Sequence, residues 1–178
     1  MNWIRRIRLG WKQALGRPAP RPSAPPLALS HPALGELAGT AEELRGAVMV
    51  GAQRVTLIVR PDGGPMDDAL RLAVEAAGQL PGLHERSLRQ IAEDSLASYN
   101  NDWRVGQTVG ADGKAVDFEK PLLSAAEFSV QFSLTEVDVC GPDLLSLWYD
   151  CGDLFWGHSF SATFFDGLAG EIDVQMLG

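Results

Sequence analysis

Apolar and polar positions alternate along much of the chain, and this alternation predicts strands. In the last segment Ile172, Val174 and Met176 alternate with polar residues, as in a strand that has one buried face and one wet face. Six segments carry strand patterning and are expected to pair antiparallel, the first two as a hairpin through Gly51 and the last four as a β-meander: residues 47–50, 54–59, 134–139, 144–149, 159–165 and 171–176.

A period of three to four residues replaces the alternation in the middle of the chain. It predicts two helices, over residues 67–79 and 83–100. Asp67 and Asp68 suit the first turn of the first helix, because acidic side chains are favoured at the positive end of the helix dipole. The dipeptide 81–82, Pro-Gly, is expected to break the pattern between the two helices.

A third, short helix is predicted by its capping signal. Ser124 and Glu127 match a capping box, in which each side chain satisfies a free backbone N–H of the other residue. We therefore expect a helix over residues 125–132, whereas residues 106–120 have the composition of an exposed loop.

These elements predict the fold class. A sheet with one apolar face must bury that face, and the two long helices are the elements available to cover it. The expected fold is α+β and two-layered, with a mainly antiparallel sheet covered on one face by two helices. Residues 33–178 then form a single acidic domain.

Residues 1–16 have the pattern of a basic amphipathic helix. An apolar arc carries Trp3, Ile7 and Trp11, while Arg5, Arg6 and Arg8 point elsewhere. Such a leader suits docking to an anionic membrane surface or to a groove on a partner protein. The alternative, that it packs on its own domain or extends without order, remains open.

A proline-rich segment separates this leader from the domain. Residues 17–32 hold six prolines, which block helix and sheet ladders and favour an extended linker.

Charge divides the chain sharply. Six of its 15 basic residues lie within residues 1–21, which contain no acidic residue. That segment therefore carries +6, and residues 22–178 carry −14 of the net −8. An acidic body repels phosphates, so we expect no nucleic-acid partner. The same charge suits either a solvated surface or the binding of a basic protein.

Localisation follows from what the chain lacks. No run approaches the roughly 18 apolar residues of a membrane-spanning helix, and no apolar stretch follows the basic N-terminus as in a secretory signal. Two cysteines, Cys140 and Cys151, are too few for a disulfide framework. We expect a cytoplasmic protein, with residues 1–16 as a candidate peripheral contact at the inner face of the membrane.

The densest chemistry lies in residues 147–159, which carry the candidate contact residues Trp148, Asp150, Asp153, Trp156 and His158. A lone histidine near two acids suits a general base or a metal ligand. However, the spacings match no zinc or calcium motif. Turn and bulge roles explain these residues as well. We expect no catalytic residue, metal or cofactor here.

The same residues carry a resemblance to a known family. The segments Tyr99-Asn-Asn-Asp-Trp103, Leu123-Ser-Ala-Ala-Glu-Phe128 and above all Phe155-Trp-Gly-His158 resemble the bacterial domain of unknown function 2262. The resemblance covers residues 40–178 and includes the closing Gly178. It implies a bacterial domain of similar boundaries and implies no activity. In size and style the family is similar to immunity proteins of bacterial toxin systems.

The function expected is that of a non-enzymatic protein-interaction module, of immunity type. The alternative is a small enzyme or ligand-binding domain centred on Asp150, Asp153 and His158. An interaction protein should expose an aromatic or acidic patch, whereas an enzyme should converge its polar groups in a cleft.

The leader yields a first testable prediction. Full-length protein should sediment with anionic vesicles, and added salt should weaken this binding, because the attraction depends on the basic residues. Liposome sedimentation measures it directly. If removal of the leader markedly lowers the melting temperature of the domain, the leader belongs to the core and the prediction is wrong.

Overall fold

The computed structural model describes residues 25–178. The predicted leader, residues 1–16, lies outside these residues, as do its candidate docking residues Trp3, Arg5, Arg6, Ile7, Arg8 and Trp11.

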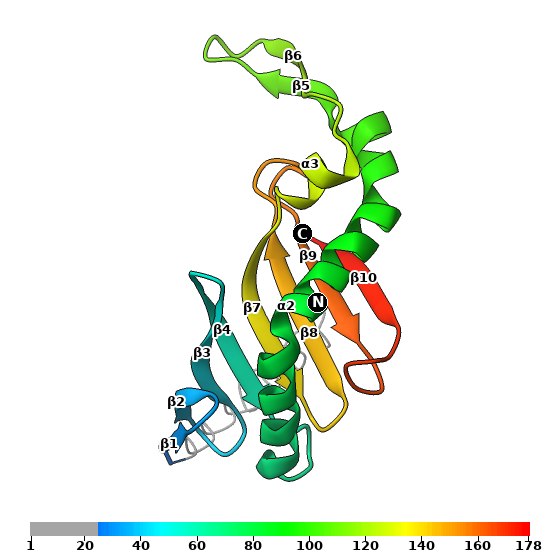
Figure 1. The fold of residues 1–178 in the computed structure, drawn as a ribbon. Coiled ribbons are helices and arrows are strands. Elements are labelled where there is room, and N and C mark those ends of the chain that lie inside the picture. The colour runs from blue at the N-terminus through cyan, green and yellow to red at the C-terminus, as the bar shows by residue number, and fades with distance from the viewer. Residues whose placement is uncertain (1–24) are drawn as a thin grey trace, which may run out of the picture.

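The described part of the chain contains an eight-stranded sheet (Figure 1). Its strands, in spatial order, are β1 (Leu27–His31), β2 (Gly35–Gly39), β3 (Leu44–Val50), β4 (Gln53–Arg60), β7 (Ser133–Cys140), β8 (Leu144–Asp150), β9 (Ser159–Phe164) and β10 (Ile172–Leu177). All neighbouring strands pair antiparallel except β4 and β7, which are parallel. The mainly antiparallel sheet, with its first hairpin and its β-meander, is confirmed.

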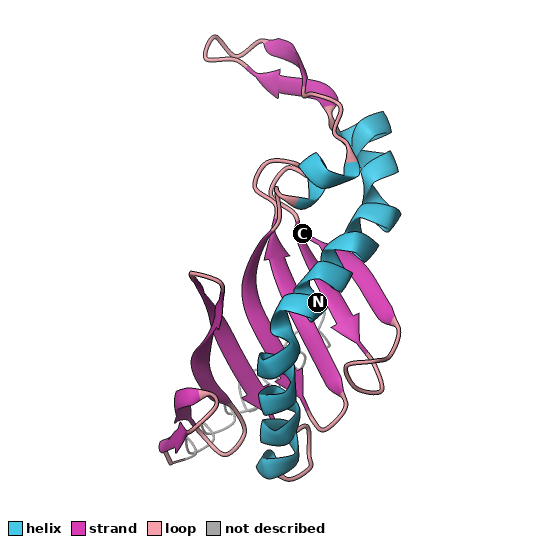
Figure 2. Cartoon of the chain, in the orientation of Figure 1, coloured by secondary structure: helices cyan, strands magenta, loops and turns pink. Residues whose placement is uncertain are grey.

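A long helix, α2 (Met66–Ser98), lies across one face of this sheet and bends along its length (Figure 2). The two-layer α+β architecture is confirmed, but the break predicted at residues 81–82 is wrong. Pro81 lies inside the helix, on its exposed side. Buried residues on both sides of it, including Leu80 and Leu83, pack on the sheet. A proline in a helix costs about 3 kcal/mol. Burying several apolar side chains, at about 1.5–3 kcal/mol each, outweighs that cost.

The core lies between α2 and the sheet. It is built from alternate residues of the central strands, including Leu57 and Val59 of β4, Leu145 and Leu147 of β8, and Phe160 and Phe164 of β9. In β10, Ile172 and Val174 are half-buried as the alternation predicts. Met176 is 42% exposed, because an edge strand has a neighbour on one side only.

The range predicted as a linker ends earlier than expected. Leu27–His31 form β1 and pair with β2, so the linker prediction is wrong over these residues. The prolines of that range flank β1 rather than interrupt it, and an edge strand tolerates nearby proline. A truncation that tests the leader should therefore stop at residue 24.

The loop predicted over residues 106–120 is instead a hairpin. β5 (Val105–Val109) and β6 (Ala115–Glu119) form a separate two-stranded sheet that projects from the end of the molecule (Figure 1). Gly113, with φ of +78°, turns the chain, and the Asp112 side chain accepts from the N–H of Lys114. Both faces of the hairpin are largely exposed. In β6, Val116 and Phe118 alternate with Asp117 and Glu119, but β5 carries no such alternation, and the prediction of a loop overlooked this short signal.

The short helix α3 (Ala125–Ser129) begins where the capping box predicts. The Ser124 hydroxyl accepts from the N–H of Glu127, and the Glu127 carboxylate accepts from the N–H of Ser124. Within residues 25–178, no helix is long and apolar enough to cross a membrane.

A half-buried histidine of α2 gives a pH-dependent prediction. His84 stacks on Tyr149, with 3.1 Å between Nδ1 and the phenol oxygen, and burial lowers the pKa of His84. Burial likewise raises the pKa of Tyr149. Because the unfolded chain binds a proton at His84 more readily, the free energy of unfolding should fall as pH decreases below about 6.5. Urea unfolding at several pH values should show this slope in the parent and a flatter one in His84→Gln. Equal slopes in the two proteins would contradict the assignment.

Candidate functional site

The segment between β8 and β9 folds into a loop closed by its own hydrogen bonds. The Asp150 carboxylate accepts from the N–H of Gly152 at 2.9 Å. The Cys151 thiol donates to the carbonyl of His158 at 3.2 Å. His158 Nδ1 donates to the carbonyl of Phe155 at 2.6 Å. His158 thus bonds to the backbone of its own loop, which these three contacts hold in one shape.

An aromatic cluster holds this loop against the end of α2. A π-helical turn, η2 (Tyr99–Trp103), follows α2 and aims its aromatic rings at the loop. The ring of Trp103 lies 5.3 Å from that of Phe155 and 5.3 Å from that of His158, both edge-on. Tyr99 is fully buried and packs against Phe128 and Phe155. Edge-on aromatic pairs of this kind add about 0.5–1.5 kcal/mol each beyond burial.

Asn100 clamps the same turn to the segment before α3. Its Nδ2 donates to the carbonyl of Leu123 at 2.9 Å, and its Oδ1 accepts from the N–H of Leu123 at 3.0 Å. The three segments that carry the family resemblance, residues 99–103, 123–128 and 155–158, therefore converge on one end of the domain.

Trp156 is the aromatic residue of this loop whose side chain stays exposed to solvent. Its φ of +54° lies in the left-handed region, which costs a residue with a side chain on the order of 1 kcal/mol, and Gly157 follows at +87°. The indole stands edge-on to Trp103 and to Phe118, with ring centroids 5.5 and 6.0 Å apart, yet Trp156 is 55% exposed. The backbone is thus strained at a residue whose aromatic side chain is exposed to solvent.

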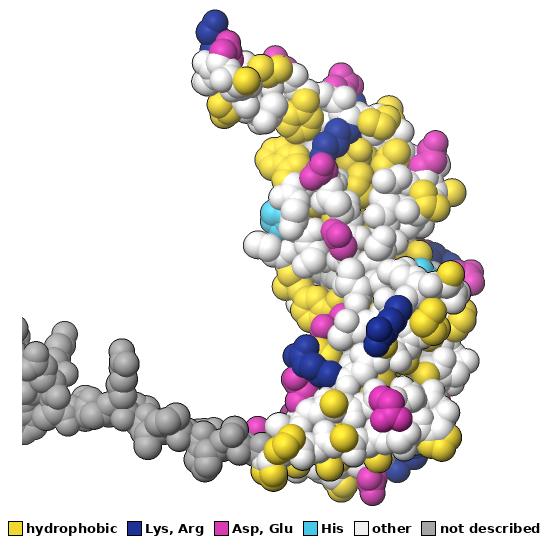
Figure 3. Space-filling view, turned by 90° about the vertical axis from the view of Figure 1, so that its left-hand side faces the viewer, with side chains coloured by type: hydrophobic (Ala, Val, Ile, Leu, Met, Phe, Trp, Pro, Cys, Tyr) yellow, Lys and Arg dark blue, Asp and Glu magenta, His cyan; other side chains and the backbone are white. Residues whose placement is uncertain are grey.

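A groove of about 510 Å³ lies beside this indole. Its walls come from both strands of the hairpin and from the loop: Gln107, Thr108, Phe118, Lys120, Asp153, Trp156 and Gly157. Figure 3 shows hydrophobic side chains gathered over this end of the molecule, from the loop to the projecting hairpin. The shape is an open groove with an aromatic wall.

The five candidate residues of the loop region do not form one site. Trp156 and His158 meet around Trp103, and Asp153 borders the groove beside Trp156. Asp150 is exposed at the end of β8. Trp148 lies on the sheet face opposite α2, where its Nε1 is buried without a hydrogen-bond partner among the described residues. The carboxylates of Asp150 and Asp153 form no hydrogen bond with His158 within residues 25–178.

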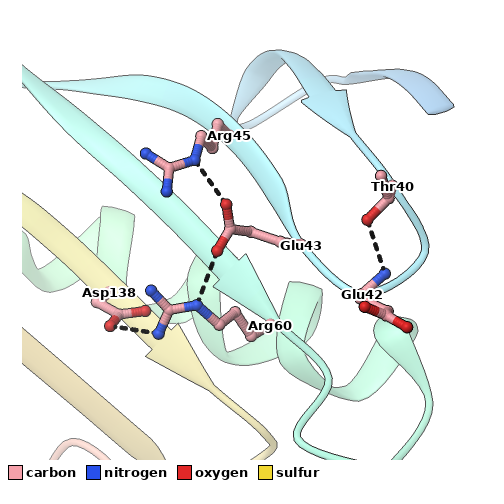
Figure 4. Close-up of polar contacts among 6 residues, drawn as sticks. All are labelled: Thr40, Glu42, Glu43, Arg45, Arg60 and Asp138. Atoms are coloured by element: carbon pink, nitrogen blue, oxygen red, sulfur yellow. Dashed lines mark hydrogen bonds and ion pairs between the residues drawn. The ribbon is translucent and has the colours of Figure 1, made fainter. Parts of the chain in front are cut away.

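The sequence interpretation missed an ion-pair network on that opposite face (Figure 4). Arg60 of β4 joins Glu43, at 3.0 Å, to Asp138 of the parallel neighbour β7, at 2.8 Å. Arg45 donates to the other oxygen of Glu43 at 2.6 Å. Asp138 lies 78 residues from Arg60, and the four residues match no motif, so the sequence carried no signal for the network.

The electrostatics of this network favour a structural role. Hydrogen bonds from Arg45 and Arg60 lower the pKa of Glu43. Burial raises the pKa of Asp138, and this effect outweighs the nearby Arg60. Burial and the charge of Asp138 raise the pKa of Glu136. The two arginines are engaged by carboxylates of the same network, which ties β3, β4 and β7 together.

Metal-binding residues do not gather in the part of the chain that the structure describes. Among residues 25–178, no three His, Cys, Asp or Glu side chains lie close enough to hold an ion. Cys140 and Cys151 are both free thiols.

Comparison with protein families gives one assignment. A family model described as an uncharacterized protein conserved in bacteria, DUF2262, matches residues 36–164. This range begins in β2 and ends with β9, so it includes the hairpin and the loop of Trp156 but stops short of β10 and Gly178. The search of curated proteins and the search of solved structures give no match.

His158 provides the prediction that separates scaffold from chemistry. His158→Gln should lower the free energy of unfolding by about 1–3 kcal/mol, because a partly buried hydrogen bond to Phe155 is lost. His31→Gln serves as the control, since that ring contacts its own exposed turn, and should change stability by less than about 0.5 kcal/mol. Urea unfolding measures both. A His158→Gln protein as stable as the parent that loses a bound ligand or an activity would reverse the assignment.

Proposed function

The chain belongs to the DUF2262 family of bacterial proteins, whose description assigns no activity, and we propose that its domain is a non-enzymatic protein-interaction module. The observation that carries this proposal is Trp156. Its side chain is held in place by Trp103 and Phe118 and is still more than half exposed, on a backbone that is strained to hold it there. Tryptophan is among the residues most enriched at the energetic centres of protein interfaces.

The projecting hairpin extends this surface. Val116 is 49% exposed, although valine is usually found inside a fold. Val109, which is 74% exposed, lies on the other face of the hairpin. Val116 shares its hairpin face with Phe118, the residue that Trp156 packs against. A row of apolar side chains on a projecting element is typical of an interaction surface.

The enzyme alternative finds less support in the same geometry. A general base needs an orienting partner and a cleft that its reactive nitrogen lines. The bond from His158 Nδ1 to the carbonyl of Phe155 orients the ring and leaves Nε2 as the nitrogen that could react. However, neither Asp150 nor Asp153 bonds to this ring within residues 25–178, and an Asp150 oxygen accepts from the N–H of Gly152 instead. The groove beside Trp156 is lined by Asp153 and by neither of the other two residues.

Two finer parts of the proposal rest on the sequence. An acidic body of this size suits an immunity-type partner for a basic toxin, and a toxin gene adjacent to this one would support that assignment. Residues 1–16 would add a peripheral contact with the inner face of the membrane.

The proposal is tested by partner capture with matched variants. Full-length protein, Trp156→Ala and Val116→Ser should be compared as baits in a lysate of the source bacterium, with captured proteins identified by mass spectrometry. Trp156→Ala should lose a specific partner at least about tenfold, as loss of an interface hot spot does. Met49→Ser is the control. Met49 is 59% exposed, similar to Trp156 at 55%, but it lies in the β3–β4 hairpin.

Melting temperatures should accompany the capture, since Trp156 also contacts its own fold. Val116→Ser leaves those aromatic contacts intact and should reduce capture without lowering the melting temperature. A partner retained equally by both hairpin-side variants would contradict the proposed surface.

A further inference from the structure

We propose that the groove beside Trp156 binds a basic peptide segment of the partner protein, anchored by a large apolar side chain between Trp156 and the β5–β6 hairpin. This inference rests on the proposed function and specifies the partner's chemistry. It follows from the shape of the groove, the distribution of charge around it and the free edges of the hairpin.

The groove is suited to an apolar anchor. Its volume of about 510 Å³ is large enough for a bulky side chain, and the rings of Trp156 and Phe118 form its wall. Gly106 keeps the base of the hairpin close to these rings, because a Cβ there would lie 2.9 Å from Phe118 and 3.0 Å from Trp156. A side chain that enters the groove would remove aromatic surface from water, which is the main favourable term in association.

The charge at this end of the domain is acidic, whereas the lining of the groove itself holds one carboxylate, Asp153, and one cation, Lys120. This end of the domain carries more acidic than basic side chains. It has six carboxylates, namely Asp102, Asp112, Asp117, Glu119, Asp150 and Asp153, and three cations, namely Arg104, Lys114 and Lys120. Two of the cations are already paired, Arg104 with Glu119 and Lys114 with Asp112.

Two exposed carboxylates lie at the groove or next to it: Asp153 lines the groove, and Asp117 is bonded to Gln107, which lines it. The Lys120 amino group donates to the backbone carbonyl of Asp153 and lies over the ring of Phe118, 5.7 Å from its centroid. Neither Asp153 nor Asp117 has an ion-pair partner within residues 25–178, and both are exposed. Asp117 Oδ1 accepts from Gln107 Nε2 at 2.8 Å, so its charge is not neutralised by a cation. Lysine or arginine side chains that flank the apolar anchor would meet these carboxylates. The charge of −14 on residues 22–178 would draw such a segment in from a distance.

The hairpin also offers backbone groups to an extended segment. β5 and β6 pair with each other and join no other strand of the described chain, so both outer edges are unpaired there. An isolated two-stranded hairpin is marginal in water. An added strand would satisfy one edge with main-chain hydrogen bonds, while its side chains select the partner.

The test is a selection of random peptides, displayed on phage, against the full chain. Enriched peptides are then synthesised, and their dissociation constants are measured for the parent and for two variants. The first is Trp156→Ala. The second is the double variant Asp117→Asn with Asp153→Asn. Glu36→Gln with Glu42→Gln is its matched control, because it removes the same charge from exposed residues around β2, in the other half of the sheet.

Enriched peptides should carry an aromatic or large aliphatic residue flanked by Lys or Arg. Trp156→Ala should weaken their binding at least about tenfold. The Asp117/Asp153 variant should weaken it about two- to fivefold, and the control pair should weaken it less. The difference between the two double variants should vanish at about 1 M salt, where the screening length falls to about 3 Å.

The other outcomes separate this inference from the proposed function. Peptides that depend on Trp156 but are neutral or acidic, and ignore the Asp117/Asp153 variant, would overturn the basic partner while supporting the interaction surface. Peptides that bind Trp156→Ala as tightly as the parent would overturn the groove as the binding site. A selection that enriches no peptide would overturn peptide binding, whereas partner capture would still decide the proposed function.

Discussion

The packing of aromatic rings at the end of α2 is the interaction on which the functional end of this domain depends. Tyr99 and Trp103 reach the loop between β8 and β9 through Phe155, while Asn100 holds the segment before α3 by both polar groups of Leu123. Three stretches of chain, distant in sequence, are fixed to one another in this way. The β5–β6 hairpin follows η2 directly in the chain, and Trp156 of the loop packs against Trp103 of η2. The geometry of the exposed surface therefore follows from the buried cluster.

A second constraint operates at the middle of the sheet. Within residues 25–178, β4 and β7 form the one parallel pair, and the chain between them contributes α2, the hairpin and α3. Arg60 bridges that seam by contacting Glu43 and Asp138 together. Because Asp138 is buried and its second oxygen has no partner among the described residues, the network positions strands at some cost in stability. The network thereby joins the two antiparallel halves of the sheet beneath α2.

The sequence predicted most of the elements and less of their arrangement. The alternation in β10 and the capping box of α3 are local signals, and both held. The break predicted at Pro81 was wrong because the sequence shows only the local penalty of a proline in a helix. The burial of apolar side chains along α2 outweighs that penalty. The β5–β6 hairpin was missed because neither face is buried and the short alternation in β6 was overlooked. Of the candidate residues, Trp156 and His158 both pack against Trp103. The sequence pattern assigned the Trp103 side chain to no face of a helix or strand, so it could not predict this contact.

The Asn100 clamp and the aromatic rings form a scaffold for the exposed surface. The most direct test compares Asn100→Ala with Asn101→Ala, an exposed neighbour, by urea unfolding and by hydrogen exchange. Loss of two hydrogen bonds should cost Asn100→Ala about 1–3 kcal/mol and should speed exchange in the hairpin and in residues 151–158. Asn101→Ala should stay within about 0.5 kcal/mol of the parent. An Asn100→Ala protein that unfolds and exchanges like the parent would contradict the claim.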